Sequence, residues 1–192
     1  AVVDVGIAAD VPGVGILDRK VRRGTGNIAV EDAMTRPEAL AAMAAGMEQA
    51  ARARADSITA LGIGEMGIGN TSTSAAVLSA LTGADIEAVT GRGGGLTNEG
   101  FARKKDVLRR ALTRRAVDKD DVLDVLCAVG GLDIAAMAGA FLGCARERIP
   151  AAVDGFISVV AALCAVTLCP EVQDYLFLSH DCLLYTSPSP RD

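Results

Sequence analysis

Aromatic and imidazole side chains are scarce in this sequence. Tryptophan is absent, aromatic residues make up 3% of the chain, and His180 is the only histidine. Half of the residues are apolar, with many alanines and glycines, and this composition is typical of closely packed helices over a sheet. No serine or cysteine is spaced to form a catalytic triad with His180, so we interpret this histidine as structural.

Long apolar runs and basic tracts are also missing. The longest apolar run, Phe156 to Cys169, is shorter than the roughly 18 residues that a membrane span needs. The net charge is −5, and basic residues gather only in the mixed segment 103–115, which disfavours nucleic-acid binding. No charged-then-apolar leader opens the chain, whose first residues already resemble a strand. We therefore predict a cytoplasmic protein that binds neither membranes nor nucleic acid, and we expect its true N-terminus to precede Ala1.

The cysteines form no C-x-x-C pair. The first four of the five lie in apolar helical segments, and the full set is Cys127, Cys144, Cys164, Cys169 and Cys182. An odd number at these spacings is typical of small buried hydrophobic residues in a reducing compartment. We predict no metal site and no cofactor.

A glycine-rich turn is the most informative stretch of the chain. Four glycines fall within residues 62–69, between an apolar run at 57–63 and a helix-forming run at 72–81. A strand that turns through glycines into a helix directs several backbone N–H groups at one point, where the helix N-terminus adds partial positive charge. The turn therefore predicts a phosphate site.

Two familiar phosphate motifs fit this turn poorly. Gly62-x-Gly64-x-x-Gly67 matches the dinucleotide fingerprint, but no second strand with a terminal acid follows at the proper spacing, since Asp85 lies in a turn after a helix. No G-K-[ST] is present, which excludes a Walker loop. A site for a single phosphate explains the turn better. Glu65 within it is a chemical group, a clamp on a sugar or base, or a turn acid that faces water.

Strand and helix signals alternate along the chain. They predict strands at 1–9, 57–63, 149–153 and 175–178, and helices at 36–55, 72–82, 97–116, 118–130, 134–146 and 156–168. Between the first strand and the first helix, 10–28 is expected to be a charged loop, either functional or merely solvated. Alternation of this kind predicts an α/β fold with a parallel sheet.

Local details accompany these helices. Thr35 and Glu38 form a capping-box pattern with Pro37 in the first turn, and Asp118 is expected to cap a later helix. In the first helix the spacing predicts a buried stripe of Leu40, Met43, Ala44 and Met47. Small residues at 135–139 should let another helix approach closely. The helix at 156–168 is apolar nearly all round, which indicates burial or an oligomer contact.

Three polar segments follow predicted strands, namely 62–70, Asp154-Gly155 and Ser179-His180. Ligands of parallel α/β sheets gather at the carboxyl ends of strands. We therefore expect these segments to form one site. Lys104, on a basic helix, is either a phosphate contact or one more solvated charge.

Together these residues resemble a known family. Gly64-Glu65-Met66-Gly67-Ile68-Gly69-Asn70-Thr71 is similar to the signature of the nicotinate-nucleotide–dimethylbenzimidazole phosphoribosyltransferases of cobalamin synthesis. The similarity continues in order to about residue 180, and its further segments are 23–28, Gly91-Arg92-Gly93, Lys104 with 110–112, 130–135, 150–157 and 175–180.

The resemblance implies a three-layer α/β/α enzyme with a mainly parallel, Rossmann-like sheet, forming a homodimer. It would move phosphoribose from nicotinate mononucleotide to 5,6-dimethylbenzimidazole, releasing nicotinate with inversion at the ribose C1′. Glu65 would orient the substrates. The binding residues implied are Gly64, Glu65, Met66, Gly67, Ile68, Gly69, Asn70, Thr71, Gly91, Arg92, Gly93, Lys104, Asp154, Gly155 and Ser179.

Two features depart from the family pattern. The family's N-terminal helices are absent, and its general-base glutamate belongs to a motif beyond the serine–histidine segment that this chain does not contain. We therefore expect an enzyme core at 1–181 that is inactive alone, followed at 182–192 by a Ser/Pro-rich, non-family coil from read-through or a sequencing error. The rival interpretation is a non-catalytic nucleotide-binding module.

Overall fold

The structure is a computed structural model, and it describes residues 1–11, 13 and 15–179. The expected coil at 182–192 lies outside these residues. The elements, in chain order, are β1 (Val2–Asp4), β2 (Ile16–Asp18), α1 (Arg36–Ala55), β3 (Leu61–Ile63), α2 (Asn70–Thr82), α3 (Ile86–Val89), α4 (Asn98–Thr113), α5 (Val122–Val129), α6 (Leu132–Glu147), β4 (Ala151–Val153), α7 (Phe156–Leu168), the 3₁₀ helix η1 (Pro170–Tyr175) and β5 (Leu176–Leu178).

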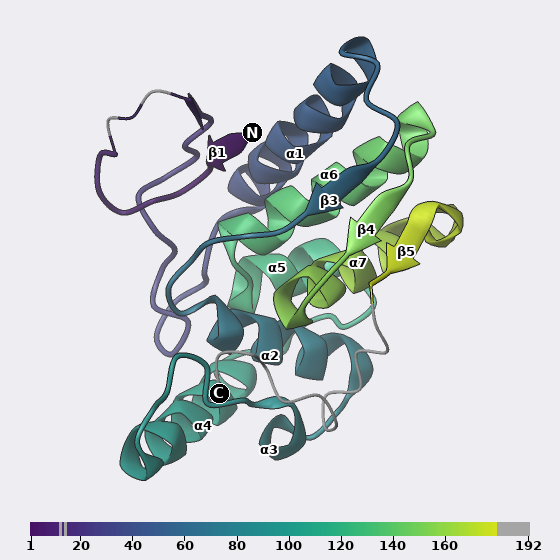
Figure 1. The fold of residues 1–192 in the computed structure, drawn as a ribbon. Helices are drawn as coiled ribbons and strands as arrows, with labels where there is room; N and C mark the ends of the chain where they lie inside the picture. Colours follow the sequence, from purple (N-terminus) through teal and green to yellow (C-terminus); the bar gives the residue numbers. More distant parts are fainter. Residues whose placement is uncertain (12, 14, 180–192) are drawn as a thin grey trace.

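The strands pair in parallel, which confirms the α/β class. Among the described residues they form two sheets instead of the single sheet expected, with β1 paired to β2 and the order β3-β4-β5 in the other. Figure 1 shows the three-stranded sheet beside α6 and α7, and β1 well apart from it. The expected strands at 1–9 and 57–63 each shorten to three residues, because pairing, which sequence periodicity does not report, sets their length.

One face of the three-stranded sheet is open within the described residues. Gly62, Ala152 and Phe177 are in register across it, and all three are exposed. The helices α6 and α7 contact the sheet, and the Ser158 hydroxyl of α7 donates a 2.8 Å hydrogen bond to the Ile63 carbonyl of β3. A third layer over the open face stays a prediction.

The core centres on α1 and α6, which lie side by side (Figure 1). A Cβ on Gly46 would collide with the Ala136 backbone, and one on Gly139 with the Met43 backbone. The two backbones thus approach as closely as glycine and alanine allow, which confirms the expectation for 135–139. Close approach of this kind gives many dispersion contacts in a core with few large side chains.

The predicted capping box of α1 is present. Thr35 accepts from the Glu38 N–H, and the Glu38 carboxylate accepts from the Thr35 N–H at 2.7 Å. The predicted buried stripe is wrong for Leu40, which is 49% exposed, and for Ala44, which is also exposed. The buried face of the helix consists mainly of other alanines and Gly46, because only small side chains fit where the two backbones approach so closely.

Two further expectations need correction. Asp121, not Asp118, is the N-cap of α5, and it accepts from the Leu123 N–H at 2.9 Å. The segment 10–28 is not simply a solvated loop, because it contains β2, and Lys20 forms a 2.6 Å ion pair with the buried Asp4.

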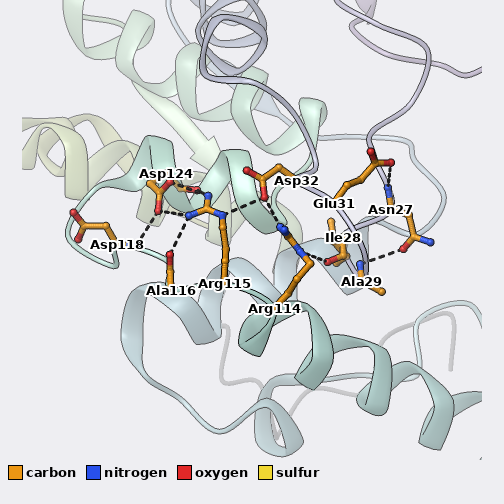
Figure 2. Close-up of polar contacts among 10 residues, drawn as sticks. All are labelled: Asn27, Ile28, Ala29, Glu31, Asp32, Arg114, Arg115, Ala116, Asp118 and Asp124. Atoms are coloured by element: carbon orange, nitrogen blue, oxygen red, sulfur yellow. Dashed lines mark hydrogen bonds and ion pairs between the residues drawn. The ribbon is translucent and has the colours of Figure 1, made fainter.

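An ion-pair network fastens the segment before α1 to α4 and α5. The Arg115 guanidinium contacts both Asp124 oxygens, at 2.8 and 3.0 Å, and Asp32 at 3.1 Å (Figure 2). Arg114, the C-cap of α4, also donates to Asp32. Each charge here has an opposite charge beside it, so we interpret this Arg115 network as structural.

Three of the described cysteines, Cys127, Cys144 and Cys164, are buried and free, as expected of small hydrophobic residues, and burial raises the pKa of Cys144 to about 11. Cys169 is only partly buried.

No helix among the described residues combines the length and apolarity that crossing a membrane requires. Nor do residues 1–11, 13 and 15–179 contain a group of three or more potential metal ligands.

Candidate active site

The glycine turn leads from β3 into α2, as the sequence predicts. Gly69 is the N-cap of α2 and has φ +87°, a backbone conformation that favours glycine. As a glycine it has no side chain with which to cap the first turn. The Ser72 N–H donates to the Gly69 carbonyl at 2.9 Å, while the Asn70 and Thr71 N–H groups, with the partial positive charge of the helix, are available to an anion.

The carboxyl ends of three strands meet at the same edge of the sheet. Ile63, Val153 and Leu178 are in register, so the residues that follow them come out side by side. Among these, Ser179 donates a 2.5 Å hydrogen bond to Asp154 Oδ1. Gly155, with φ +80°, then begins α7. The predicted placement of Gly64, Asp154 and Ser179 at one edge of the sheet is thus seen in the structure, and their forming one binding site stays a prediction. His180 lies outside the described residues.

Lys104 crosses from α4 to the start of α2. Its Nζ donates to the Thr71 hydroxyl and to the Gly91 carbonyl, both at 2.9 Å. The side chain is half-buried, and burial lowers its pKa. No carboxylate of the described residues forms an ion pair with it. The alternative of a plain solvated charge is therefore wrong for Lys104.

The second glycine segment lies against the same lysine. A Cβ on Gly93, whose φ is +63°, would come 3.0 Å from Thr71 Oγ1 and 3.7 Å from Lys104 Nζ. Arg92 does not join them, because its guanidinium donates to the Leu96 carbonyl and to Asn98 and lies over the Phe101 ring. Gly91 and Gly93 thus line the Lys104 site, whereas Arg92 braces its own loop.

Glu65 contacts a residue that the sequence did not single out as its partner. Its carboxylate accepts a 2.5 Å hydrogen bond from the Asn70 side chain, which also donates to Asp133 of α6 at 2.8 Å. Asn70 is buried, whereas Glu65 is exposed. Asp133 lies within the matching segment 130–135, but only the fold shows that it reaches the turn.

Met66 and Ile68 project from the turn. They are 94% and 106% exposed, respectively, the highest values among the large apolar side chains described. Side chains this exposed are typical of a surface that meets another group. Their role as binding residues stays a prediction.

The sequence of this chain is similar to those of a known class of enzymes. Residues 1–183 match the family described as Phosphoribosyltransferase, so this chain belongs to that family, and the predicted resemblance is confirmed. Membership favours an enzyme over the non-catalytic module.

Individual relatives carry a more specific name. The chain is 48% identical over 181 residues to the nicotinate-nucleotide–dimethylbenzimidazole phosphoribosyltransferase of Geobacter metallireducens, covering 94% of this chain and 51% of that one. It is 45% identical over 179 residues to the enzyme of that name from Ruminiclostridium cellulolyticum, covering 93% and 51%. The chain thus spans about half the length of these curated relatives.

Solved structures agree with the sequence comparison. The crystal structure of CobT from Thermus thermophilus superposes with a TM-score of 0.87 at 43% identity, covering 93% of this chain and 54% of that one. A second Thermus thermophilus structure, titled as the nicotinate-nucleotide–dimethylbenzimidazole phosphoribosyltransferase, gives 0.85 at 42% identity, covering 93% and 52%. The arrangement of α/β elements is therefore that of this family.

Proposed function

We propose that this chain holds nicotinate mononucleotide, with its phosphate at the N-terminus of α2 beside Lys104. One observation carries the proposal: the Lys104 ammonium is fixed at the start of a helix by a hydroxyl and a carbonyl. A cation is disfavoured at a helix N-terminus, where partial positive charge already gathers. Desolvation adds to this cost, as the lowered pKa of Lys104 indicates. A bound phosphate would offset both the repulsion from the helix end and the desolvation of the Lys104 ammonium.

The proposed activity is that named for the relatives, a transfer of phosphoribose from nicotinate mononucleotide to 5,6-dimethylbenzimidazole. The incoming base nitrogen forms a bond to the ribose C1′, the bond from C1′ to nicotinate breaks, and the base loses its proton. Inversion at C1′ follows if the base attacks opposite the leaving nicotinate. Anchoring of the phosphate fixes the position of C1′, which reduces the entropy cost of bringing the two reactants together.

In this proposal the site residues have separate roles in binding the phosphate and orienting the substrates. Gly67 to Thr71 and Lys104 hold the phosphate, and Glu65 orients the substrates from the turn. Asp154, Gly155 and Ser179, at the neighbouring strand ends, line the same pocket. Removal of the proton requires a placed base, and we assign it to no described residue.

Calorimetry on the 192-residue chain tests the phosphate site directly. Nicotinate mononucleotide should bind, nicotinate riboside, which lacks the phosphate, should bind much more weakly, and inorganic phosphate should compete. Equal affinities for nucleotide and riboside would contradict the proposal. As part of the same proposal the protein acts as a cytoplasmic homodimer, which sedimentation analysis tests for the oligomeric state.

A further inference from the structure

The carboxamide of Asn70 lies between two carboxylates from distant parts of the chain. Its Nδ2 donates to Glu65 Oε2 at 2.5 Å and to Asp133 Oδ2 at 2.8 Å. An asparagine side chain has two N–H donors, and both are used here. Flipping the amide would turn its oxygen toward two carboxylate oxygens, so the pair of acids fixes its orientation.

Asp133 is itself held firmly. It occupies the second position of α6, where the helix end favours a negative charge, and its Oδ1 accepts a 2.9 Å hydrogen bond from the Ile134 N–H. Its side chain is half-buried. Asp133 is thus anchored on a core helix, whereas Glu65 belongs to an exposed turn.

Two glycines make this contact possible. A Cβ on Gly67 would lie 2.7 Å from Asn70 Nδ2 and 3.3 Å from Asp133 Oδ2, and a Cβ on Gly131 would collide with Asp133 Oδ1. Neither position requires glycine for its φ, since neither is among the positive-φ glycines. Space for the Asp133–Asn70 contact therefore explains both glycines.

We propose that Asp133 is a positioning residue that acts through Asn70 to hold the Glu65 carboxylate in place for the nucleotide. Asp133 fixes the amide, and the second N–H of the amide then fixes one oxygen of Glu65. Without Asp133 the Asn70 amide is free to turn. Its N–H then no longer points steadily at the Glu65 carboxylate, which loses its fixed position. The consequence for ligand binding rests on the proposed function, but the positioning itself does not.

The ligand-free test is the NMR signal of the two Asn70 side-chain N–H protons in the full chain. Replacement of Glu65 by Gln should shift mainly the proton that faces it. Asp133→Ala should shift both, because the amide loses its fixed orientation. If Asp133→Ala shifts only one proton, Glu65 is held independently of Asp133 and the proposal is wrong. Should Asp133→Ala fail to fold, Asp133→Asn, which keeps the size and removes the charge, is measured in the same way.

A double-mutant cycle with nicotinate mononucleotide tests the consequence. Asp133→Ala should weaken binding about tenfold, the effect of one lost hydrogen bond, and should weaken it no further when Glu65 is already Gln. Equal losses in both backgrounds would overturn the proposal, since Asp133 would then not act through Glu65. The matched control is Glu99→Ala, because Glu99 is exposed and occupies the same second position of α4. It should leave affinity unchanged.

The two experiments separate this proposal from the proposed function. If the unmodified chain fails to bind the nucleotide while the Asn70 protons respond as described, the function is wrong and the positioning stands. If the nucleotide binds and the protons do not respond to Asp133→Ala, the positioning is wrong and the function stands.

Discussion

The two ends of α4 both present basic side chains to other parts of the molecule, but the partners differ. At the C-terminal end, Arg115 meets Asp32 and Asp124 (Figure 2). In the N-terminal half, Lys104 meets a hydroxyl and a carbonyl. The first arrangement neutralises its charge within the protein, whereas the second leaves a positive charge unneutralised by the described residues.

The pKa shifts express the same contrast. Hydrogen bonds from Arg115 lower the pKa of Asp124 against the opposing effect of burial, so the charged acid is stabilised in the fold. Burial lowers the pKa of Lys104, so the charged lysine is destabilised in the fold. The Arg115 network therefore contributes to stability, while Lys104 costs stability that a bound anion would offset.

The largest expected effect is at the helix end facing Lys104. Gly69→Asp should abolish measurable binding of nicotinate mononucleotide, because a carboxylate would stand where the phosphate is proposed to bind. A Cβ at Gly69 meets open space, so the substitution acts through charge and backbone conformation. Calorimetry on the folded variant measures the loss.

Gly69→Asn is the matched control for this substitution. Asparagine and aspartate have similar size, and both tolerate a left-handed backbone better than other side chains. The Asn variant should therefore keep most of the affinity. If the two variants lose affinity equally, the phosphate is not where we propose it to be.

Next in size is the loss expected from Lys104→Ala. Nucleotide binding should weaken by about 1.5–3 kcal/mol, the range for a hydrogen bond to a charged group. Lys105→Ala is the control, because Lys105 pairs with Glu87 at 2.8 Å and lies over the Phe101 ring, away from the turn. Its affinity should hardly change. Similar losses from both variants would show that overall positive charge, not the position of Lys104, governs binding.

Local signals predicted the longer helices of this fold well, whereas the short α3 and η1 were missed. The capping box at Thr35, the glycine after α2 and the run that became α7 each depend on a few neighbouring residues. The strands were predicted too long, and β2 was missed, because three-residue strands are defined by partners elsewhere in the chain. The division into two sheets likewise depends on pairing between distant segments.

The candidate site likewise combines features that local sequence predicted with contacts that only the fold reveals. The phosphate turn and the joint placement of three strand ends followed from glycine spacing and general α/β topology. The Asn70–Asp133 contact joins residues 63 positions apart, and no local pattern around Asp133 indicates it. Arg92 was expected at the site, and only the structure shows its guanidinium bonded within its own loop.

A smaller effect is expected from removing the Arg115 ion pairs at the C-terminal end of α4. Arg115→Ala should reduce the free energy of unfolding by about 1–2 kcal/mol at neutral pH, since it leaves the half-buried Asp124 carboxylate without this partner, while the exposed Asp32 keeps Arg114. Nucleotide affinity should stay the same. Denaturant titration measures the first quantity and calorimetry the second. A loss of affinity without a loss of stability would remove the distinction between the two ends.

Acid should erase this difference in stability. Because Arg115 lowers the folded-state pKa of Asp124, the stabilisation is present above the ordinary value of 3.8 and is lost as the pH falls through the lower folded value. The unmodified chain and Arg115→Ala should therefore converge in stability as the pH falls from about 5 to about 2. Curves that stay parallel over this range would mean that Arg115 acts by packing alone.

The smallest expected effect is on the alkaline side, where Lys104 loses its proton. Burial lowers its folded-state pKa below the ordinary value of 10.5, so in the free protein the ammonium begins to discharge at a lower pH than an exposed lysine would. Binding of the phosphate dianion favours the charged form, so affinity should fall as the pH rises toward the ordinary lysine range, and binding should take up a fraction of a proton. Calorimetry in buffers of different ionisation enthalpy measures both quantities. Lys104→Arg keeps its charge throughout this range and should show neither the decline nor the proton uptake. If the decline persists in that variant, another group titrates with the ligand, and Lys104 is not the cation that holds the phosphate.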